Sequence, residues 1–574
     1  MKITLCWHMH QPFYRNELEQ NYSLPWVYLH AIKDYADMAW HLENHPNMHL
    51  VVNFTPSLLE QLNDYADNMR NWLESSTSMN DQLLNLLAGV DAIPEEPTAR
   101  LKIIKDCLRC NQQQMIDIWP AYKKLARYAK SLMGKDREDL AALSYLDSQY
   151  FYDLLVWYHL AWLGYSLKQQ EKVKQLLEKK YSYNEKDRKE LVSIMHDCIE
   201  QLIPRYRQLA ENGQIELSMT PWGHPIVPLL NDFDNMQCSQ PDMPRPESPK
   251  YPDGTARSHW HMQHGMEVFE NCFGMRPSGV WLSEGGISED ALQCLDSYNI
   301  NWTASGESVW RHSAQLSGIN EHEIADKQGL FQRQQIDGNN CSIFFRDDGL
   351  SDLIGFEYQD WSSDDAVANF AMHISNIEEH LGDDADNSLI SVILDGENAW
   401  EYYPDNGNDF LNLLYSELTE NNQIETITFN KALEQLPKTT MPSLCPGSWV
   451  YGSFSTWIGE DAKNRAWDLL VKAKQQYDDV MNHGQLDERK KEIANRQLGI
   501  CEGSDWFWWF GDYNPAQSIQ DFDHLYRCQL RQLYKILECQ IPPNLDIALS
   551  HTSLLPHDNL QDNSDPSGTM RRNI

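Results

Sequence analysis

Short apolar runs of strand-forming residues recur along the chain, and longer stretches with apolar residues at helical spacing separate them. This alternation is typical of an α/β fold in which crossover helices connect parallel strands. Seven such runs are enough to close a barrel rather than form a small open sheet. They are Ile3–Trp7, His49–Phe54, Ile215–Thr220, Ser278–Leu282, Asn301–Ala304, Ser342–Phe345 and Leu389–Leu394. A further run, Ile424–Phe429, has the same character but no assigned place in this order.

The connection between the second and third predicted strands is much longer than one crossover helix. Residues 65–212 contain three segments with apolar residues at helical spacing, Leu101–Leu132, Arg137–Leu167 and Asn184–Asn212. We therefore expect a helical subdomain inserted on the rim of the barrel.

The chain again has helical periodicity after about residue 455, most clearly over Glu460–Gln476 and Ile519–Leu537. We divide it into a barrel over residues 1–440, a helical domain over 441–555 and a polar tail over 556–574. The composition of the tail predicts disorder. No long linker separates the first two parts, so the C-terminal helices are expected to pack on the barrel.

Polar residues follow the apolar runs at five of the seven predicted strand ends. The carboxyl ends of parallel strands in a barrel meet on one face, where such enzymes place their sites. One polar strand end is weak evidence, whereas five that converge indicate a polar cleft. The residues concerned are His8, His10, His224, Glu284, Arg346, Asp347, Asp348, Asp352 and Asp395.

Glu284 and Asp395 have the most informative contexts among these residues. Each ends an apolar run and is followed by glycine, as in Trp281-Leu-Ser-Glu-Gly and Leu394-Asp-Gly. Glycosidic bond cleavage needs two carboxyl groups, one to attack or stabilise the sugar carbon and one to protonate the leaving oxygen. Either acid alone is as easily explained as a cap on a strand end. Their separation, which only the fold sets, would distinguish retaining from inverting chemistry.

Composition and charge narrow the choice of ligand. The chain has 20 Trp and 26 Tyr, whose flat faces suit stacking on sugar rings, although large domains also bury such residues. Its net charge is −37, without a long basic run. A nucleic-acid surface needs clustered Lys and Arg, so we expect no nucleic-acid partner.

The distribution of apolar and cysteine residues predicts a cytoplasmic protein. We find neither a run of about 18 apolar residues nor a signal peptide after Met1-Lys2, so no membrane partner is expected. The 12 cysteines show no disulfide rhythm and are predicted to be reduced thiols. Cys107 and Cys110 form a Cys-x-x-Cys, but the second pair that a zinc site needs is missing.

Five segments taken together resemble glycoside hydrolase family 57. Singly each motif is weak, but the five occur in order from residue 4 to about 530. They are His8–Pro12, Gly213–Pro225, Trp281–Glu284, Asp395–Glu397 and the aromatic stretch Tyr451–Trp457, which continues to Trp467.

This resemblance implies a distorted TIM-like (β/α)7 barrel with a C-terminal helical domain. It also implies retaining chemistry on α-1,4-glucans without a metal or other cofactor, with Glu284 as nucleophile and Asp395 as general acid/base. The family includes amylases, pullulanases, glucanotransferases, branching enzymes and α-galactosidases, so the choice between hydrolysis, transfer and branching stays open. Asp395 must hold a proton near neutral pH, which predicts apolar neighbours such as Leu394 and Trp400 or a second negative charge on Glu397.

The remaining candidate site residues are assigned to the sugar substrate. We expect His10 and His224 to hydrogen-bond ring hydroxyls, and Arg346 and Asp352 to contribute to substrate binding. Trp281, Trp457 and Trp506 are predicted to stack on glucose units.

Two other functions are open on the residues alone. His8 and His10 with Asp347, Asp348 or Asp352 would suit a metal-dependent mannosidase or deacetylase on a related barrel. The second alternative is a glucan-binding protein without turnover. Loss of activity on chelation would favour the first, and binding without product would favour the second.

Overall fold

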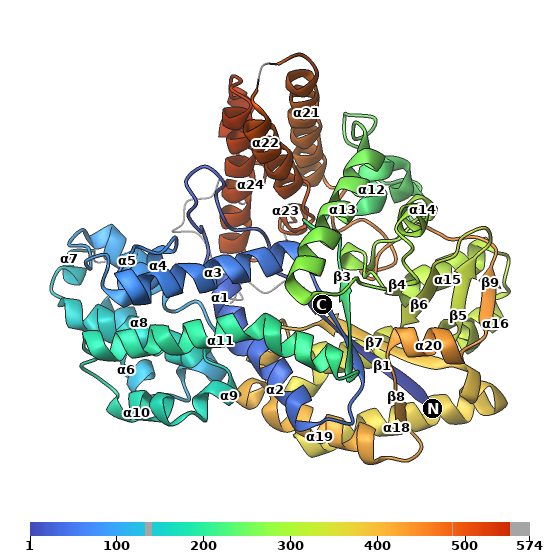
Figure 1. The fold of residues 1–574 in the computed structure, drawn as a ribbon, viewed down its shortest axis with the longest axis horizontal. Coiled ribbons are helices and arrows are strands. Elements are labelled where there is room, and N and C mark those ends of the chain that lie inside the picture. Colours follow the sequence, from blue (N-terminus) through green and yellow to red (C-terminus); the bar gives the residue numbers. More distant parts are fainter. Residues whose placement is uncertain (133–139, 485, 512, 551–574) are drawn as a thin grey trace.

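The computed structural model describes residues 1–132, 140–484, 486–511 and 513–550. Helices surround a central, mostly parallel sheet (Figure 1). Its strands are β1 (Lys2–Met9), β2 (Leu50–Phe54), β3 (Ile215–Met219), β4 (Trp302–Gly306), β5 (Arg333–Ile336), β6 (Ser342–Arg346), β7 (Leu389–Asp395), β8 (Glu425–Thr426) and β9 (Lys438–Met441).

The sheet closes into a barrel. Parallel pairing runs through β3, β2, β1, β7 and β6 and continues from β6 to β4. Between β4 and β3 lies the segment Gly279–Trp281, which forms parallel bridges to both: Met219 pairs with Val280, and Gly279 pairs with Trp302. Six strands and this bridging segment make seven parallel elements around the ring, which confirms the predicted (β/α)7 barrel.

Backbone hydrogen bonds join the bridging segment to both neighbours, and side chains reinforce them. Glu216 on β3 accepts hydrogen bonds from Trp302 Nε1 at 2.6 Å and from Ser278 Oγ at 3.0 Å. A Cβ at Gly279 would lie 1.8 Å from the Trp302 ring, so only glycine permits this approach. The predicted strand Ser278–Leu282 is thus present as this short bridging segment of the barrel.

Three short strands lie outside the ring of seven. β8 pairs with the first residues of β1, Lys2 and Ile3, and so gives the run Ile424–Phe429 its place. β5 runs antiparallel to β6 and pairs with β9, which extends the sheet at one side.

The helical insertion packs beside the barrel, on the left in Figure 1. Its longest helix, α11, begins with a capping box formed by Asn184 and Asp187 and leads directly into β3. Tyr206 on α11 donates a buried hydrogen bond to the Tyr35 carbonyl, which ties the insertion to the first crossover. The main helices are α3 (Pro56–Ser75), α4 (Gln82–Ala88), α5 (Pro97–Asp106), α6 (Pro120–Leu132), α8 (Ser148–Trp162), α10 (Glu171–Lys179) and α11 (Glu185–Glu211).

The C-terminal helices rise above the barrel in Figure 1. They are α21 (Asp461–His483), α22 (Glu488–Cys501), α23 (Asp505–Trp508) and α24 (Ala516–Ile536). A buried ion cluster joins them to α13 (Gly254–Phe273): Glu502 accepts from Arg257 and His261, each at 2.8 Å. The predicted tail, 556–574, lies outside the described residues.

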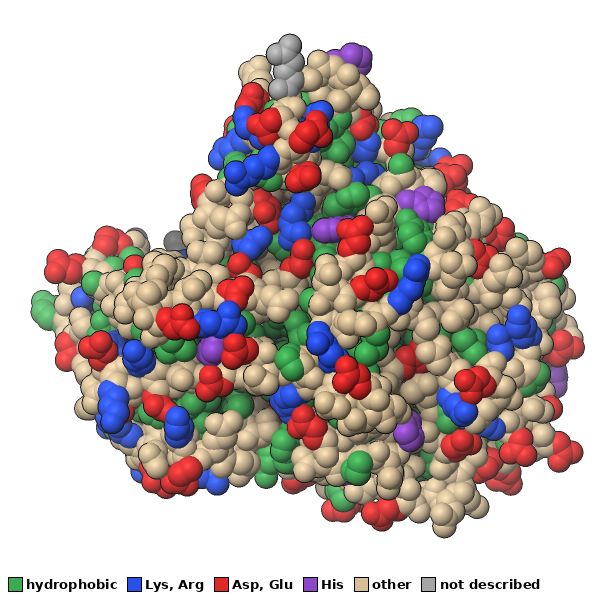
Figure 2. Space-filling model, viewed as in Figure 1, with side chains coloured by type: hydrophobic (Ala, Val, Ile, Leu, Met, Phe, Trp, Pro, Cys, Tyr) green, Lys and Arg blue, Asp and Glu red, His purple; other side chains and the backbone are tan. Residues whose placement is uncertain are grey.

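Acidic and basic side chains are interspersed on the face shown in Figure 2, and on that face no large basic patch forms. This distribution agrees with the net charge of −37. Among the helices that the structure describes, none has the length and apolar character needed to cross a membrane.

Candidate active site

Strand ends of the barrel and loops of the C-terminal region enclose a cavity of about 240 Å³. Seven of the nine polar residues predicted at the strand ends line it: His8, His10, Glu284, Arg346, Asp348, Asp352 and Asp395. These residues are far apart in sequence, and the barrel brings them together because their strands run parallel. The opposite wall is aromatic and includes Trp449, Tyr451, Trp508 and Trp509.

Glu284 stands on a tight turn directly after the bridging segment. Its φ of 58° and ψ of 26° lie in the left-handed region, as does the φ of Gly285 at 57°. His224 and Tyr451 also have φ of 57°. Non-glycine residues rarely adopt this conformation, and such residues concentrate at functional sites. The turn aims the Glu284 side chain into the cavity while burying it to 6% exposure.

Trp449 fixes the Glu284 carboxyl group. Its indole Nε1–H donates to Glu284 Oε2 at 2.9 Å, and its backbone N–H donates to the Glu284 carbonyl at 3.1 Å. Burial raises the pKa of Glu284 well above its ordinary value, and the charge of Asp395 raises it further. The Trp449 hydrogen bond opposes this change because it stabilises the ionised form.

Asp395 ends β7, where Asn398 Nδ2 donates to its Oδ2 at 2.6 Å. Burial raises its pKa to about 6, while the Asn398 hydrogen bond and the charges of His10 and Arg346 act in the opposite direction. The apolar surroundings that we predicted, with Leu394 and Trp400 buried, are present.

A third carboxyl group, Glu397, lies beside this pair. Burial and the charge of Asp395 raise the pKa of Glu397 well above its usual value. Gln11 Nε2 donates to Glu397 Oε1 at 3.3 Å. Burial therefore favours the neutral form of Glu397, and the charge of Asp395 disfavours ionisation of both Glu284 and Glu397.

Three histidines form a stack behind the cavity. His8 Nδ1–H donates to Asn53 Oδ1 at 2.6 Å, so its Nε2 accepts from His224 Nε2–H at 3.2 Å. Burial lowers the pKa of His8 to about 3 and that of His224 well below its ordinary value, so both rings are neutral. His224 Nδ1 accepts from Ser504 Oγ at 2.8 Å.

His10 lines the cavity together with His8. Its Nε2 bonds Asp505 Oδ1 at 2.7 Å, and its ring stacks on His224 with centroids 3.8 Å apart. Its Nδ1 has no hydrogen-bond partner among the described residues. The expectation that His224 bonds sugar hydroxyls is corrected: both of its ring nitrogens are engaged and it supports His10 from behind.

Arg346 and Asp352 form part of one charged group at the cavity wall. Arg346 forms ion pairs with Asp348, at 2.8 Å, and with Asp352. Its guanidinium carbon lies 5.1 Å from the centroid of the Trp449 ring. Arg346 thereby packs against the residue that holds Glu284 and also lowers the pKa of Asp395.

The three tryptophans predicted to stack on sugar do not reach the cavity. Trp281, Trp457 and Trp506 are at most 1% exposed and line other parts of the core. Trp281 packs behind Trp449, with ring centroids 5.1 Å apart, and Trp506 Nε1 donates to the Ile500 carbonyl. Their rings lack a free face, which corrects the prediction.

Sequence reasoning missed the aromatic residues that do line the cavity. Trp449 stands two residues before the aromatic stretch Tyr451–Trp457. The available signal for it was its place at the end of the sequence Gly-Ser-Trp. Trp508 and Trp509 also line the cavity, and Asp505 bonds His10.

The proposed metal ligands are not assembled as a group. Asp347 accepts from the Leu350 N–H, and Asp348 pairs with Arg346. In the described part of the chain, a group with ligand atoms close enough to share a metal is His10, His224 and Asp505. Hydrogen bonds inside the protein already use the facing atoms of these three residues.

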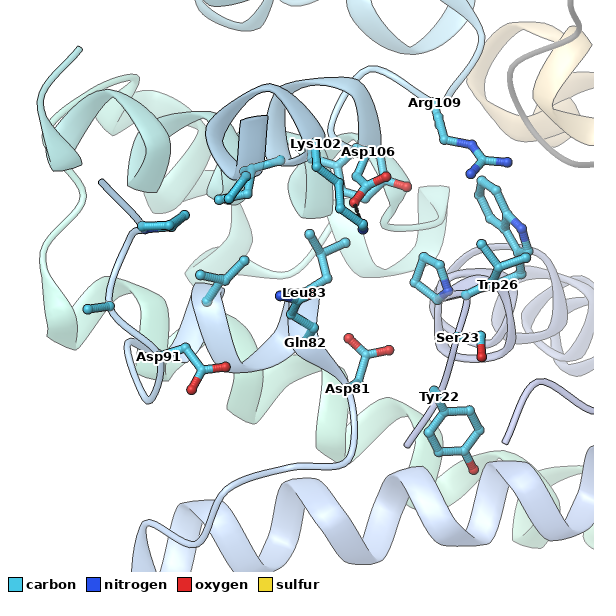
Figure 3. Close-up of a pocket in the computed structure, with 18 residues that line it drawn as sticks. Tyr22, Ser23, Trp26, Asp81, Gln82, Leu83, Asp91, Lys102, Asp106 and Arg109 are labelled. Atoms are coloured by element: carbon cyan, nitrogen blue, oxygen red, sulfur yellow. Dashed lines mark hydrogen bonds and ion pairs between the residues drawn. The ribbon is translucent and has the colours of Figure 1, made fainter. Parts of the chain in front are cut away.

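A second cavity, of about 250 Å³, lies in the helical insertion (Figure 3). Its basic groups are paired: Lys102 bonds Asp106 at 2.6 Å, and Arg109 bonds Asp521 of α24 at 3.1 Å. The Arg109 guanidinium also lies 5.2 Å from the centroid of the Trp26 ring. Arg109 thus links the insertion to the C-terminal helices.

A parallel barrel that places two coupled carboxyl groups in one cavity is the arrangement of an enzyme that cleaves or transfers glycosidic bonds. Residues 4–445 match the family model described as Glycosyl hydrolase family 57. The chain belongs to this family, and it is a glycosidase or transglycosylase. A search of curated proteins found no significant sequence match.

Solved structures share the whole architecture at low sequence identity. A GH57 branching enzyme from Thermococcus kodakaraensis has a TM-score of 0.57 at 15% identity and covers 98% of this chain and 97% of its own. A GH57-type branching enzyme from Pyrococcus horikoshii has a TM-score of 0.55 at 14% identity, covering 95% and 96%. The alpha-amylase AmyC from Thermotoga maritima has 0.55 at 13% identity, covering 100% and 99%.

Proposed function

We propose that this protein is a retaining enzyme that hydrolyses or transfers α-1,4-glucans, with Glu284 as nucleophile and Asp395 as general acid/base. The observation that carries the proposal is the electrostatic coupling of these two carboxyl groups across one cavity. The similar solved structures are named as branching enzymes and an alpha-amylase, which supports a glucan as substrate.

The first step uses the form in which Asp395 is protonated and Glu284 is ionised. Ionised Glu284, held by the Trp449 indole, attacks C1 of the sugar and forms a glycosyl ester. Asp395 transfers its proton to the departing oxygen, so that the shortened glucan leaves as an alcohol.

The second step reverses these roles. Asp395, now ionised, removes a proton from water or from a sugar hydroxyl, whose oxygen attacks C1 and releases Glu284. Water gives hydrolysis, and a sugar hydroxyl gives transfer. Asn398 stabilises the ionised form of Asp395 in this step through its 2.6 Å hydrogen bond.

The surrounding groups are assigned to binding. His10 lines the cavity, and Asp352, with half of its side chain exposed, is placed to accept from sugar hydroxyls. Trp449, Tyr451, Trp508 and Trp509 supply the aromatic wall against which sugar rings pack.

Incubation with maltoheptaose and amylose, with products resolved over time, tests the activity. Shorter products alone mean hydrolysis, longer products mean transfer, and new α-1,6 linkages mean branching. Glu284→Gln should lose several orders of magnitude in turnover, and azide should restore part of it as a glycosyl azide of inverted configuration. Wild-type binding without any product would sink the proposal in favour of a binding protein.

Chelation separates this proposal from the metal-dependent alternative. The two-carboxylate route predicts unchanged activity after exhaustive chelation and no stoichiometric zinc by elemental analysis. One zinc per chain, lost together with activity, would transfer the chemistry to the group of His10, His224 and Asp505.

A further inference from the structure

Two cysteines that are far apart in sequence bring their sulfur atoms together near the active site. The Sγ atoms of Cys238 and Cys445 lie 2.8 Å apart, across a sequence separation of 207 residues. Cys238 is exposed, whereas Cys445 is buried. Within the described ranges this is the one sulfur–sulfur contact among the 12 cysteines. Both cysteines are free thiols in the structure.

Cys445 begins the segment that carries Trp449 to Glu284. The Cys445 N–H donates to Ser313 Oγ at 2.9 Å. Two residues later, Gly447 exchanges backbone hydrogen bonds with Ile287, at 2.9 and 3.2 Å. Two further residues lead to Trp449 and its two hydrogen bonds to Glu284. A constraint on Cys445 therefore acts close to the cleft wall.

Cys238 belongs to a different segment that already lies along the same loop. It follows the 3-10 turn Phe233–Gln237. Gln240 Nε2 donates to Ser453 Oγ at 3.4 Å. Met243 packs against Gly459, where a Cβ would lie 2.6 Å from the methionine side chain. These two contacts, both shortly after Cys238, hold its segment along the loop that follows Cys445.

We propose that Cys238 and Cys445 are a thiol pair that forms a reversible disulfide, and that this bond fixes the cleft wall carrying Trp449. The bond goes beyond the proposed function, because its formation does not depend on glucan chemistry. The 2.8 Å between the sulfurs already places each thiol within reach of the other.

Glutathione disulfide is a sufficient oxidant. The Cys238 thiolate attacks one sulfur of glutathione disulfide and releases a first glutathione thiol, leaving a mixed disulfide on Cys238. The Cys445 thiolate then attacks the Cys238 sulfur and releases a second glutathione thiol. Two electrons pass from the protein thiols to glutathione disulfide, and the two thiol protons end on the two glutathione molecules.

The order of these steps follows from accessibility. Burial raises the pKa of Cys445 well above its ordinary value, and the neighbouring Cys238 raises it further. The exposed Cys238 therefore reacts first. Cys107 and Cys110 offer a comparison: both are buried, and Cys110 Sγ contacts Tyr122 Oη at 3.7 Å rather than another sulfur.

The test treats the reduced full-length protein with glutathione disulfide. Peptide mapping should find a Cys238–Cys445 cross-link, with two thiols lost per chain. The melting temperature should rise by a few degrees and return with dithiothreitol, because a long closed loop constrains the unfolded chain. Amide hydrogen exchange over residues 446–453 should slow at least severalfold.

Two variants make the result decisive. Cys238→Ser changes an exposed side chain and should abolish the cross-link, the shift in melting temperature and the change in exchange. Cys528→Ser removes a partly exposed cysteine that lies against His524 and should respond as the wild type does. A stable mixed disulfide on Cys238 without the cross-link would overturn the proposal. A cross-link that leaves exchange over 446–453 unchanged would overturn the claim that it fixes the wall.

Discussion

Trp449 holds Glu284 by two hydrogen bonds, one from its indole to the carboxylate at 2.9 Å and one from its backbone to the carbonyl at 3.1 Å. Glu284 follows the bridging segment of the barrel, whereas Trp449 belongs to the loop that leads to the C-terminal helices. The candidate nucleophile is therefore oriented by a segment outside the barrel, which makes the C-terminal region part of the site.

Replacing Trp449 by Phe should keep the ring but remove the donor to Glu284. A hydrogen bond to a charged group contributes about 1.5–3 kcal/mol, so kcat/KM on maltooligosaccharides should fall roughly 10- to 100-fold. Trp281→Phe is the matched control, because the Trp281 indole lacks a hydrogen-bond partner in the described residues and packs behind Trp449. Equal losses in both variants would argue against a role for the donor.

The pH dependence of activity should respond to Asn398. Asp395 acts first as an acid with a pKa of about 6, so kcat/KM should decline as pH rises above about 6 and the proton is lost. The Asn398 hydrogen bond favours the ionised form, so Asn398→Ala should raise this pKa and move the alkaline limb to higher pH. A pH–rate profile that stays in place, or moves to lower pH, would contradict the assignment.

Glu284 should lower stability at neutral pH. Its pKa is raised in the folded protein, so the folded state binds more protons than the unfolded state once pH exceeds about 4.3, and stability falls as pH rises. Glu284→Gln should raise the free energy of unfolding at pH 7 by roughly 1–2 kcal/mol, with little difference at pH 4. Glu289→Gln changes an exposed glutamate and should show neither effect in denaturant titrations.

Glu502 should behave in the opposite way. Burial alone would raise its pKa, but Arg257 and His261 lower it to about 2. Its contribution is present above the unfolded pKa of about 4.3 and is lost as pH falls toward 2. Glu502→Gln should cost roughly 3–5 kcal/mol at pH 7, because it leaves Arg257 buried without its counter-charge. The control is Glu538→Gln, which removes an exposed ion pair with Lys490 and should change the melting temperature little.

Trp457 and Tyr451 should separate core packing from substrate binding. Trp457 is fully buried, so Trp457→Ala should cost about 3–5 kcal/mol of stability while the remaining folded protein keeps its affinity. Tyr451 lines the cavity with 58% of its surface exposed. Tyr451→Ala should weaken maltooligosaccharide binding roughly tenfold, with little change in melting temperature. Calorimetry gives the stability of both variants and titration with maltooligosaccharides gives their affinity. Weaker binding by Trp457→Ala, or a large loss of stability in Tyr451→Ala, would contradict the prediction.

The barrel and the positions of its polar strand ends were predictable because buried parallel strands have a simple sequence pattern. An apolar run that ends in Asp395 or Arg346 places that residue at the barrel mouth whatever surrounds it. The bridging segment was harder to predict, since its pairing depends on Gly279 fitting against Trp302 and on the side chain of Glu216. Neither contact is visible in local periodicity.

The roles of the aromatic residues could not be predicted from the sequence. Trp506 and Trp508 are two residues apart on the same short helix, yet Trp506 faces the core and Trp508 the cavity. The rotation of α23 against α22 and α24 decides this. The histidines pose the same problem, because the stacking of His10 on His224 depends on how two separate loops meet.

The bridging segment Gly279–Trp281 and the turn that carries Glu284 are consecutive in sequence. Full ladders of hydrogen bonds join most other neighbours in the ring, but two bridged residue pairs and the Glu216 contacts join this segment to its neighbours, and β6 and β7 pair at one residue, Arg346 with Ser391. Local opening requires least work where the fewest bonds must break. On heating, the polypeptide around Glu284 and at the β6–β7 junction is therefore expected to loosen while the rest of the barrel is still folded, so that catalytic lifetime and global unfolding measure different properties of the enzyme.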